Sequence, residues 1–171
     1  REAITAKTSL LKLCFFIDSD DHQNSKLHEV NADYLIKQLA VSSIPQIIEN
    51  NHIKSIIKKQ VVINKTAIKY FSKTAIYKGK TVFIDNTEQD FDAPRFLSYF
   101  LYPKSLYSVV VSYYGSYFQI STGKNPWKLE GKVNIGKLIS KYGGGGHQNV
   151  GGLERKSKKE IMKIAEKIIK Y

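Results

Sequence analysis

The residues best suited to chemistry in this sequence are a histidine and the glycines around it, in the segment 142–152. Glycine adopts positive φ angles and lets a backbone approach a ligand, and successive N–H groups in such a loop can form an anion-binding concavity. An adjacent imidazole can donate a further hydrogen bond. The alternative is structural, because glycine just past a helix end is a common C-cap. The predicted phosphate-binding loop consists of Gly143, Gly144, Gly145, Gly146 and His147.

A second polar group lies at the end of a predicted strand, in the sequence STGKNPW at 121–127. Side chains at strand ends can converge on a ligand, and a hydroxyl, an ammonium and an amide suit a phosphate or a ribose. The Gly123-Lys124 pair does not complete a phosphate-binding Walker motif, because Phe118 stands where its first glycine should be. Trp127 can stack on a base, but a tryptophan beside a hairpin more often belongs to a core or a lid. The predicted ligand-contacting residues are Ser121, Lys124 and Asn125.

The elements that must position these residues mix strands and helices. Residues 107–114 and 117–122 are rich in β-branched and aromatic side chains, and Gly115-Ser116 between them predicts a two-residue hairpin. The pattern at 134–142 predicts a helix, capped by an asparagine, that leads into the glycine loop. The last helix should begin with a capping box at 157–160.

The first sixty or so residues have a helical pattern. Asn31 or Asp33 can cap a second helix, and Pro45 suits the first turn of a third. The remaining predicted elements are strands over 74–77 and 80–84 and a helix that opens at 92–95. The fold class is therefore α/β of the α+β type, with a mixed sheet that contains an antiparallel hairpin, flanking helices and a preceding helical segment.

The composition favours an anionic partner without proving one. Twenty-seven Lys and Arg residues against fifteen Asp and Glu give a net charge of +12, which suits nucleic acid or nucleotides but equally a solvated lysine-rich surface. The single Cys14 excludes a disulfide framework, and its apolar neighbours predict a buried thiol. No apolar run is long enough to span a bilayer, and no segment resembles a signal peptide, so we expect no membrane association and a cytoplasmic location.

Three motifs, taken in order, resemble the C-terminal substrate-binding domain of the DHH phosphoesterase superfamily. The similarity is greatest to its exopolyphosphatase-like and oligoribonuclease-like branch. The matching segments are 121–127, 133–136 and 142–152. Many relatives have Arg where Lys124 stands, and lysine keeps the charge but not the bidentate geometry.

The resemblance implies a two-lobed enzyme. An N-terminal lobe would hold two Mn²⁺ ions, and the C-terminal lobe would present the glycine loop and its histidine to the substrate phosphate. On this basis residues 1–64 would be the tail of the catalytic domain and a helical connector. Residues 65–171 would be the substrate-binding domain.

The chain also departs from the family pattern, because it has no Asp-His-His triplet. Asp18, followed by Ser19, resembles the last metal-binding motif of the catalytic lobe, which would make it a metal ligand and a catalytic carboxylate. The alternative is an exposed acidic loop that ends a helix. One carboxylate cannot organise two metal ions, so we expect this chain alone to bind Mn²⁺ weakly or not at all. We also expect it to be inactive without a catalytic lobe supplied by further sequence or another polypeptide.

Three functional hypotheses follow, and the third assigns the glycines no binding role. The first is the substrate-binding part of a Mn²⁺-dependent phosphoesterase that hydrolyses phosphodiester or phosphoanhydride bonds in short oligonucleotides or nucleotides. The second is a non-catalytic module that binds nucleic acid or nucleotides, and the third is a basic interaction domain whose glycines are only structural. The sequence leaves the oligomeric state open. It also does not identify the substrate, which could be DNA, RNA, a cyclic dinucleotide, a nucleotide bisphosphate or polyphosphate.

Overall fold

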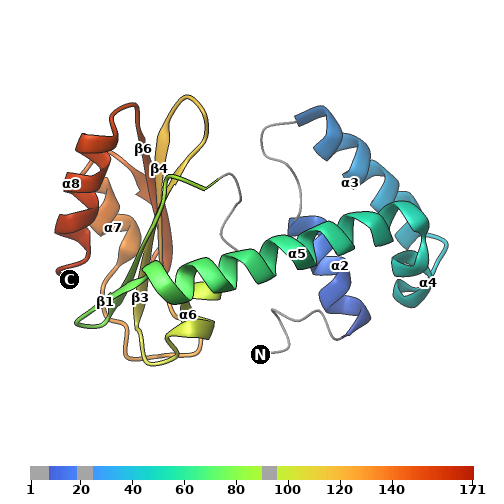
Figure 1. Ribbon diagram of the computed structural model, residues 1–171, viewed down its shortest axis with the longest axis horizontal. Helices are drawn as coiled ribbons and strands as arrows, with labels where there is room; N and C mark the ends of the chain where they lie inside the picture. Colours follow the sequence, from blue (N-terminus) through green and yellow to red (C-terminus); the bar gives the residue numbers. More distant parts are fainter. Residues whose placement is uncertain (1–7, 19–24, 90–95) are drawn as a thin grey trace. The chain divides into compact units, whose positions relative to one another are not determined.

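The computed structural model describes residues 8–18, 25–89 and 96–171, with side chains for 8–17, 32–89 and 96–171. The chain divides into two compact units, Arg1–Thr66 and Ala67–Tyr171, and the long helix α5 continues from the first into the second (Figure 1). Among the described residues no helix is long and apolar enough to cross a membrane. The helices are α2 (Ser9–Asp18), α3 (Ser25–Leu39), α4 (Ile44–Glu49), α5 (Asn51–Thr74), α6 (Leu97–Leu101), α7 (Ile135–Ser140) and α8 (Lys158–Ile168). The strands are β1 (Ile76–Lys78), β2 (Thr81–Asn86), β3 (Tyr107–Tyr113), β4 (Phe118–Lys124), β5 (Gly145–Gly146) and β6 (Val150–Arg155).

The first unit is helical, as its sequence pattern predicts, but two of its helix boundaries differ from the prediction. Asn31 and Asp33 both lie inside α3 and so cap nothing. The helix that contains Pro45 ends at Glu49, and α5 then runs on to Thr74, through the first residue of a predicted strand. The core of this unit consists of Leu13, Phe16, Leu35, Ile47, Ile48, Ile53 and Ile57.

Two smaller predictions in the first unit have opposite outcomes. Pro45 stands in the first turn of α4, where its missing N–H costs no hydrogen bond, and the Ser43 N–H is satisfied by the Gln46 side chain at 2.9 Å. The prediction of a buried thiol is wrong, because Cys14 is exposed. Its helix turns Leu13 and Phe16 into the core instead.

The second unit is built on a six-stranded mixed sheet with the order β1-β2-β3-β4-β6-β5. The predicted hairpin is confirmed as β3 and β4, which pair in antiparallel fashion around Gly115 at φ 73°. Strand β2 pairs with β3 in parallel, and α6 lies in the connection between them. All other neighbours are antiparallel. The mixed α and β fold class is therefore confirmed; the predicted helix opening at 92–95 lies outside the described residues.

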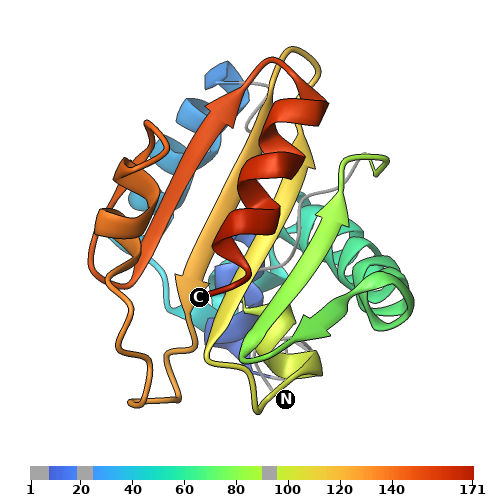
Figure 2. The same cartoon turned by 90° about the vertical axis from the view of Figure 1, so that its left-hand side faces the viewer.

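The two faces of this sheet are covered differently. Helices α7 and α8 lie on one face, here called the helix face (Figure 2). The opposite face, here called the open face, is covered over β2 and β3 by α6 and the last turns of α5. There the buried Tyr99 hydroxyl meets Ser108 at 2.8 Å, and Tyr70 donates to the Asp85 carbonyl. The helix-face core includes Val109, Val111, Ile120, Ile135, Ile139, Leu153, Ile161 and Ala165.

The capping of α8 is half of what the sequence predicts. Ser157 is the N-cap and accepts a hydrogen bond from the Glu160 N–H at 3.3 Å. The Glu160 carboxylate does not return to the N-cap backbone but accepts from Arg155 Nε at 2.8 Å. The reciprocal half of the capping box is therefore wrong, because an arginine on the preceding strand competes for that carboxylate.

Candidate functional site

One glycine of the loop is the C-cap that the structural alternative requires. Gly143 has φ 75° and its N–H donates to the Ser140 carbonyl, while the Gly144 N–H donates to the Ile139 carbonyl at 3.2 Å. This pair of hydrogen bonds, one closing across five residues, is the Schellman motif that ends many helices. Helix α7 itself begins as predicted, with Asn134 accepting from the Lys137 N–H at 3.0 Å.

Two more glycines are required by close packing. A Cβ at Gly144 would lie 2.4 Å from Ile139 Cγ2 and 2.5 Å from the Gly152 carbonyl oxygen. Gly146 has φ 154°, and a Cβ there would lie 2.3 Å from the Val150 carbonyl oxygen. Real side chains do not approach so closely, so a larger residue at either position would displace β5 or β6.

Gly145 differs from the other three glycines. It has no positive φ, and a Cβ added there would meet nothing within 4 Å. The fold therefore gives no steric reason for glycine at this position. The absence of a side chain leaves an exposed stretch of β5 backbone that another molecule can approach.

The glycine run forms half of a second hairpin, which the sequence pattern did not reveal. Strand β5 pairs with β6 in the register Gly145 with Gly152, and the His147 N–H donates to the Val150 carbonyl at 2.7 Å. Glycine has low strand propensity, so this pairing depends on the adjacent strand β6 rather than on local preference. The turn of the hairpin, with His147 exposed, is Gln148-Asn149.

The backbone carbonyls of the turn accept hydrogen bonds from neighbouring elements, whereas two of its described N–H groups do not donate to another described residue. The first N–H groups of α7, on Ile135 and Gly136, donate to the carbonyls of Gln148 and His147 at 3.1 and 2.8 Å. The Lys124 N–H donates to the Asn149 carbonyl at 2.8 Å. Within the described part of the chain, the N–H groups of Gln148 and Asn149 have no hydrogen-bond partner. The start of α7 is thus saturated, and free backbone donors lie on the turn instead.

Strand register separates the predicted ligand-contacting residues between the two faces of the sheet. Ser121, Gly152 and Gly145 lie side by side across β4, β6 and β5. Because side chains alternate along a strand, His147 belongs to the same face as Gly145, which is the open face. Lys124 belongs to the helix face, where its stem lies beside Gly131. The structure therefore brings Ser121, Gly145 and His147 onto one surface and does not bring the Lys124 stem there.

Asn125 lies at the predicted strand end, but its side chain is already committed. It is 2% exposed, its Nδ2 donates to the Ser105 carbonyl at 2.8 Å and its Oδ1 accepts from the Trp127 N–H at 3.0 Å. Both ends of the amide therefore fix the turn after β4. A contact between Asn125 and a ligand stays a prediction.

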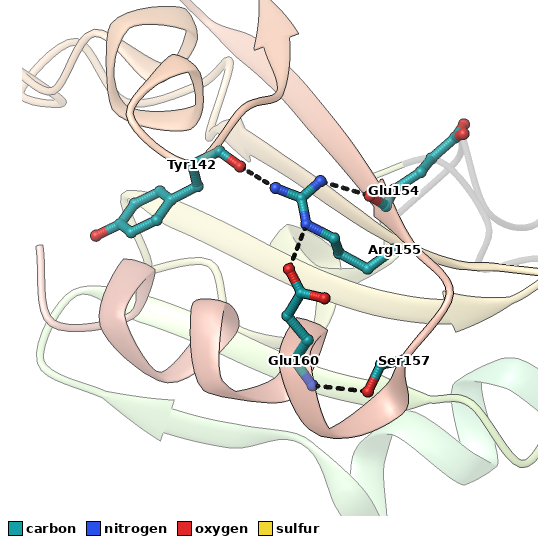
Figure 3. Close-up of polar contacts among 5 residues, drawn as sticks. All are labelled: Tyr142, Glu154, Arg155, Ser157 and Glu160. Atoms are coloured by element: carbon teal, nitrogen blue, oxygen red, sulfur yellow. Dashed lines mark hydrogen bonds and ion pairs between the residues drawn. The ribbon is translucent and has the colours of Figure 1, made fainter.

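Arg155 is a structural residue of this site that sequence patterns did not single out. Its guanidinium donates to the carbonyls of Tyr142 and Glu154 and to the Glu160 carboxylate (Figure 3). It thereby joins the end of α7, the end of β6 and the start of α8. The planar fork of arginine suits such a three-way contact. This leaves the guanidinium engaged at the base of the glycine loop.

The surroundings of the site are positively charged. Between residues 121 and 149 there is one glutamate, Glu130, and no aspartate. The lysines in this segment are Lys124, Lys128, Lys132, Lys137 and Lys141.

Under the open face, burial raises the pKa of Tyr99 to about 12, which keeps its hydroxyl neutral where it contacts Ser108.

The described residues do not fit a metal centre. Within 8–18, 25–89 and 96–171 no group of three or more His, Cys, Asp or Glu side chains is placed to hold a metal ion. Asp18 is the last residue of α2, in the first unit, and its side chain lies outside the described atoms. Its role as a metal ligand stays a prediction.

No protein-family model and no curated protein matches the sequence. Among solved structures, the pGpG-specific phosphodiesterase PggH from Vibrio cholerae matches with a TM-score of 0.79 and 21% identity, over 99% of this chain and 59% of that chain. An exopolyphosphatase-related protein from Bacteroides fragilis matches with a TM-score of 0.48 and 18% identity, over 71% of this chain and 44% of that chain. The C-Ala domain of Aquifex aeolicus alanyl-tRNA synthetase matches with a TM-score of 0.42 and 15% identity, over 57% of this chain and 96% of that chain. The last two similarities are too low to carry an argument.

The first of these matches concerns the fold of nearly the whole chain. At 21% identity the match shows a shared fold, and this fold agrees with the one that the resemblance to the DHH phosphoesterase superfamily implies. The chain spans 59% of the length of the phosphodiesterase. The chain therefore has the fold of the matching part of that phosphodiesterase.

Proposed function

We propose that this chain is the phosphate-binding portion of a DHH-type phosphoesterase that acts on short oligonucleotides or nucleotides. The observation that carries the proposal is Gly145, where the fold tolerates a side chain but the sequence has none. It lies on the open face of the hairpin, two residues before the exposed His147. A bare backbone next to an imidazole suits an anion that approaches closely.

The chemistry of binding follows from the groups around Gly145. The N–H groups of Gln148 and Asn149 can donate to phosphate oxygens, and hydrogen bonds to a charged acceptor are about twice as strong as neutral ones. The His147 imidazole and the Ser121 hydroxyl supply further donors. Lysines around the site raise the local concentration of anions. These groups bind and orient a phosphate, and none of them activates water.

Cleavage belongs to the same proposal but not to these residues. We propose that the enzyme depends on Mn²⁺, which would activate water and stabilise a leaving oxygen when bound. The His, Cys, Asp and Glu side chains of the described residues do not form a group that fits such a metal centre. A catalytic lobe that holds the ions, with or without Asp18, is the proposed partner.

The experiment compares ligand binding by the whole chain and by the His147→Ala variant. The probes are the linear dinucleotide pGpG and inorganic tripolyphosphate, titrated by calorimetry. Loss of one charge-assisted hydrogen bond should weaken binding about tenfold or more. The matched control is Lys163→Ala, an exposed position that loses a full positive charge. Lys163 belongs to α8, which lies on the helix face, opposite the open face.

The outcomes separate the proposal from its rivals. Unchanged affinity in the His147 variant would contradict a phosphate site at this loop, and equal losses in both variants would indicate unspecific attraction to lysine. Hydrolysis is assayed in the same mixtures with and without Mn²⁺, where we expect binding without cleavage. The second candidate function, a non-catalytic binding module, is favoured by the +12 charge and predicts the same binding but no gain of activity when a catalytic lobe is supplied.

A further inference from the structure

Two large aromatic side chains lie exposed against one another in the second unit. Phe96 is 43% exposed and Trp127 is 64% exposed, and their ring centroids are 5.5 Å apart at 68°. Trp127 is therefore not a core residue. Two exposed aromatic rings in contact form an apolar surface against which another flat apolar group can stack.

The backbone holds this pair in place at both ends. Phe96 has φ 66°, an unfavourable conformation for a bulky residue, and it is the only residue other than glycine with positive φ among those described. The backbone N–H of Trp127 donates to the buried Asn125 side chain at 3.0 Å. A backbone that is already constrained has less conformational freedom to lose when a ligand binds.

The aromatic pair is joined through the chain to the phosphate-binding turn. Lys124, whose N–H bonds to the Asn149 carbonyl at 2.8 Å, is three residues from Trp127. Three residues span at most roughly 10 Å even when fully extended. Lys128 follows directly, within a segment that is rich in lysine. A ligand that reaches both places must therefore be anionic at one end and flat and apolar at the other.

We propose that Phe96 and Trp127 stack a nucleobase of the ligand whose phosphate is bound at the glycine loop. This inference rests on the proposed function and adds recognition of the base to recognition of the phosphate. Stacking on an aromatic ring tolerates any base, because every base has a π-face. A protein partner is the less favoured occupant, because Lys128, the residue after Trp127, and the other lysines of this segment complement a polyanion.

Trp127 is the only tryptophan of the chain and reports its own contacts by fluorescence. The whole chain is titrated with pGpG and separately with tripolyphosphate, which carries phosphate but no base. Stacking predicts quenching of tryptophan fluorescence by the dinucleotide and none by tripolyphosphate at equal occupancy. Occupancy is measured independently by calorimetry.

Three variants complete the test. Trp127→Leu keeps an apolar side chain but no ring, and should weaken pGpG binding by about 5- to 150-fold while leaving tripolyphosphate binding unchanged. Trp127→Phe should restore most of the affinity. Leu129→Ala, which removes a 99% exposed side chain from the same loop, is the control and should change neither affinity.

Each other result overturns the inference. Binding of pGpG without quenching, or equal affinity in Trp127→Leu, would refute base stacking and leave the phosphate site intact. Equal losses for both ligands in Trp127→Leu would show that the ring supports the loop and does not read a base. No binding of either ligand by the unmodified chain would refute the proposed function and, with it, this inference.

Discussion

Exchanging two adjacent glycines separates the structural role of the loop from its proposed binding role. A Cβ at Gly144 would lie 2.5 Å from Leu153 Cβ and 2.4 Å from Ile139 Cγ2, inside the helix-face core. Overpacking of this kind costs about 1–3 kcal/mol, and contact with a backbone oxygen as well places Gly144→Ala near the upper value, at about 3 kcal/mol. For a chain of this length that lowers Tm by roughly 6–12 °C.

Gly145→Val should have the opposite profile. Its Cβ meets nothing within 4 Å and its φ is not positive, so the expected change in stability is within about 0.5 kcal/mol. A branched side chain would nevertheless stand where the phosphate must approach. Loss of even one charge-assisted hydrogen bond weakens binding by about tenfold or more.

The assay measures both quantities on both variants. Calorimetric titration with pGpG gives the affinity, and thermal unfolding gives Tm under the same conditions. We expect Gly145→Val to bind weakly at a normal Tm and Gly144→Ala to have a low Tm. Full affinity in a folded Gly145→Val protein would refute the argument that the bare backbone of β5 touches phosphate.

Four further variants, one of them a control, test the framework of the site. Asn125→Ala should cost about 1–3 kcal/mol, because it leaves two backbone groups around a buried position without partners, and Ser121→Ala, an exposed position, should cost almost nothing in urea unfolding. Arg155→Ala should lower the free energy of unfolding by about 1–2 kcal/mol, and unchanged stability would contradict its three-way role. The folded state keeps Tyr99 protonated to about pH 12, whereas an exposed tyrosine ionises near 10.0, so its stabilisation is complete below pH 10 and is lost as pH rises through 12. Tyr99→Phe should therefore flatten the alkaline loss of stability by about 3 kcal/mol, and parallel curves for the two proteins would contradict burial as the cause.

Local chemistry predicted the elements with strong turn and cap residues. The β3–β4 hairpin follows from Gly115-Ser116, and the start of α7 follows from Asn134, because these residues fix backbone geometry by themselves. The early helices were recognised but not their ends. Asn31 is wrong as a cap because α3 already begins at Ser25.

The rest of the site depends on long-range pairing that a sequence does not display. The β5–β6 hairpin consists largely of glycine, whose strand propensity is low, so its pairing was not predictable. The four glycines are indistinguishable in the sequence, but they differ in the structure. Gly143 caps α7, Gly144 and Gly146 have no room for a Cβ, and Gly145 has free space around its Cα. Backbone angles, cap hydrogen bonds and the packing around each Cα reveal that difference.

Backbone amide chemical shifts, followed while pGpG is added to the isotope-labelled chain, test the central claim most directly. The phosphate site predicts that the largest changes fall on the N–H groups of Gln148 and Asn149, which have no partner among the described residues, and on Gly145 beside them. The same changes should appear with tripolyphosphate. Shifts confined to the lysines of α8, or none in 143–149 at saturating ligand, would contradict the assignment of this loop as the phosphate-binding site.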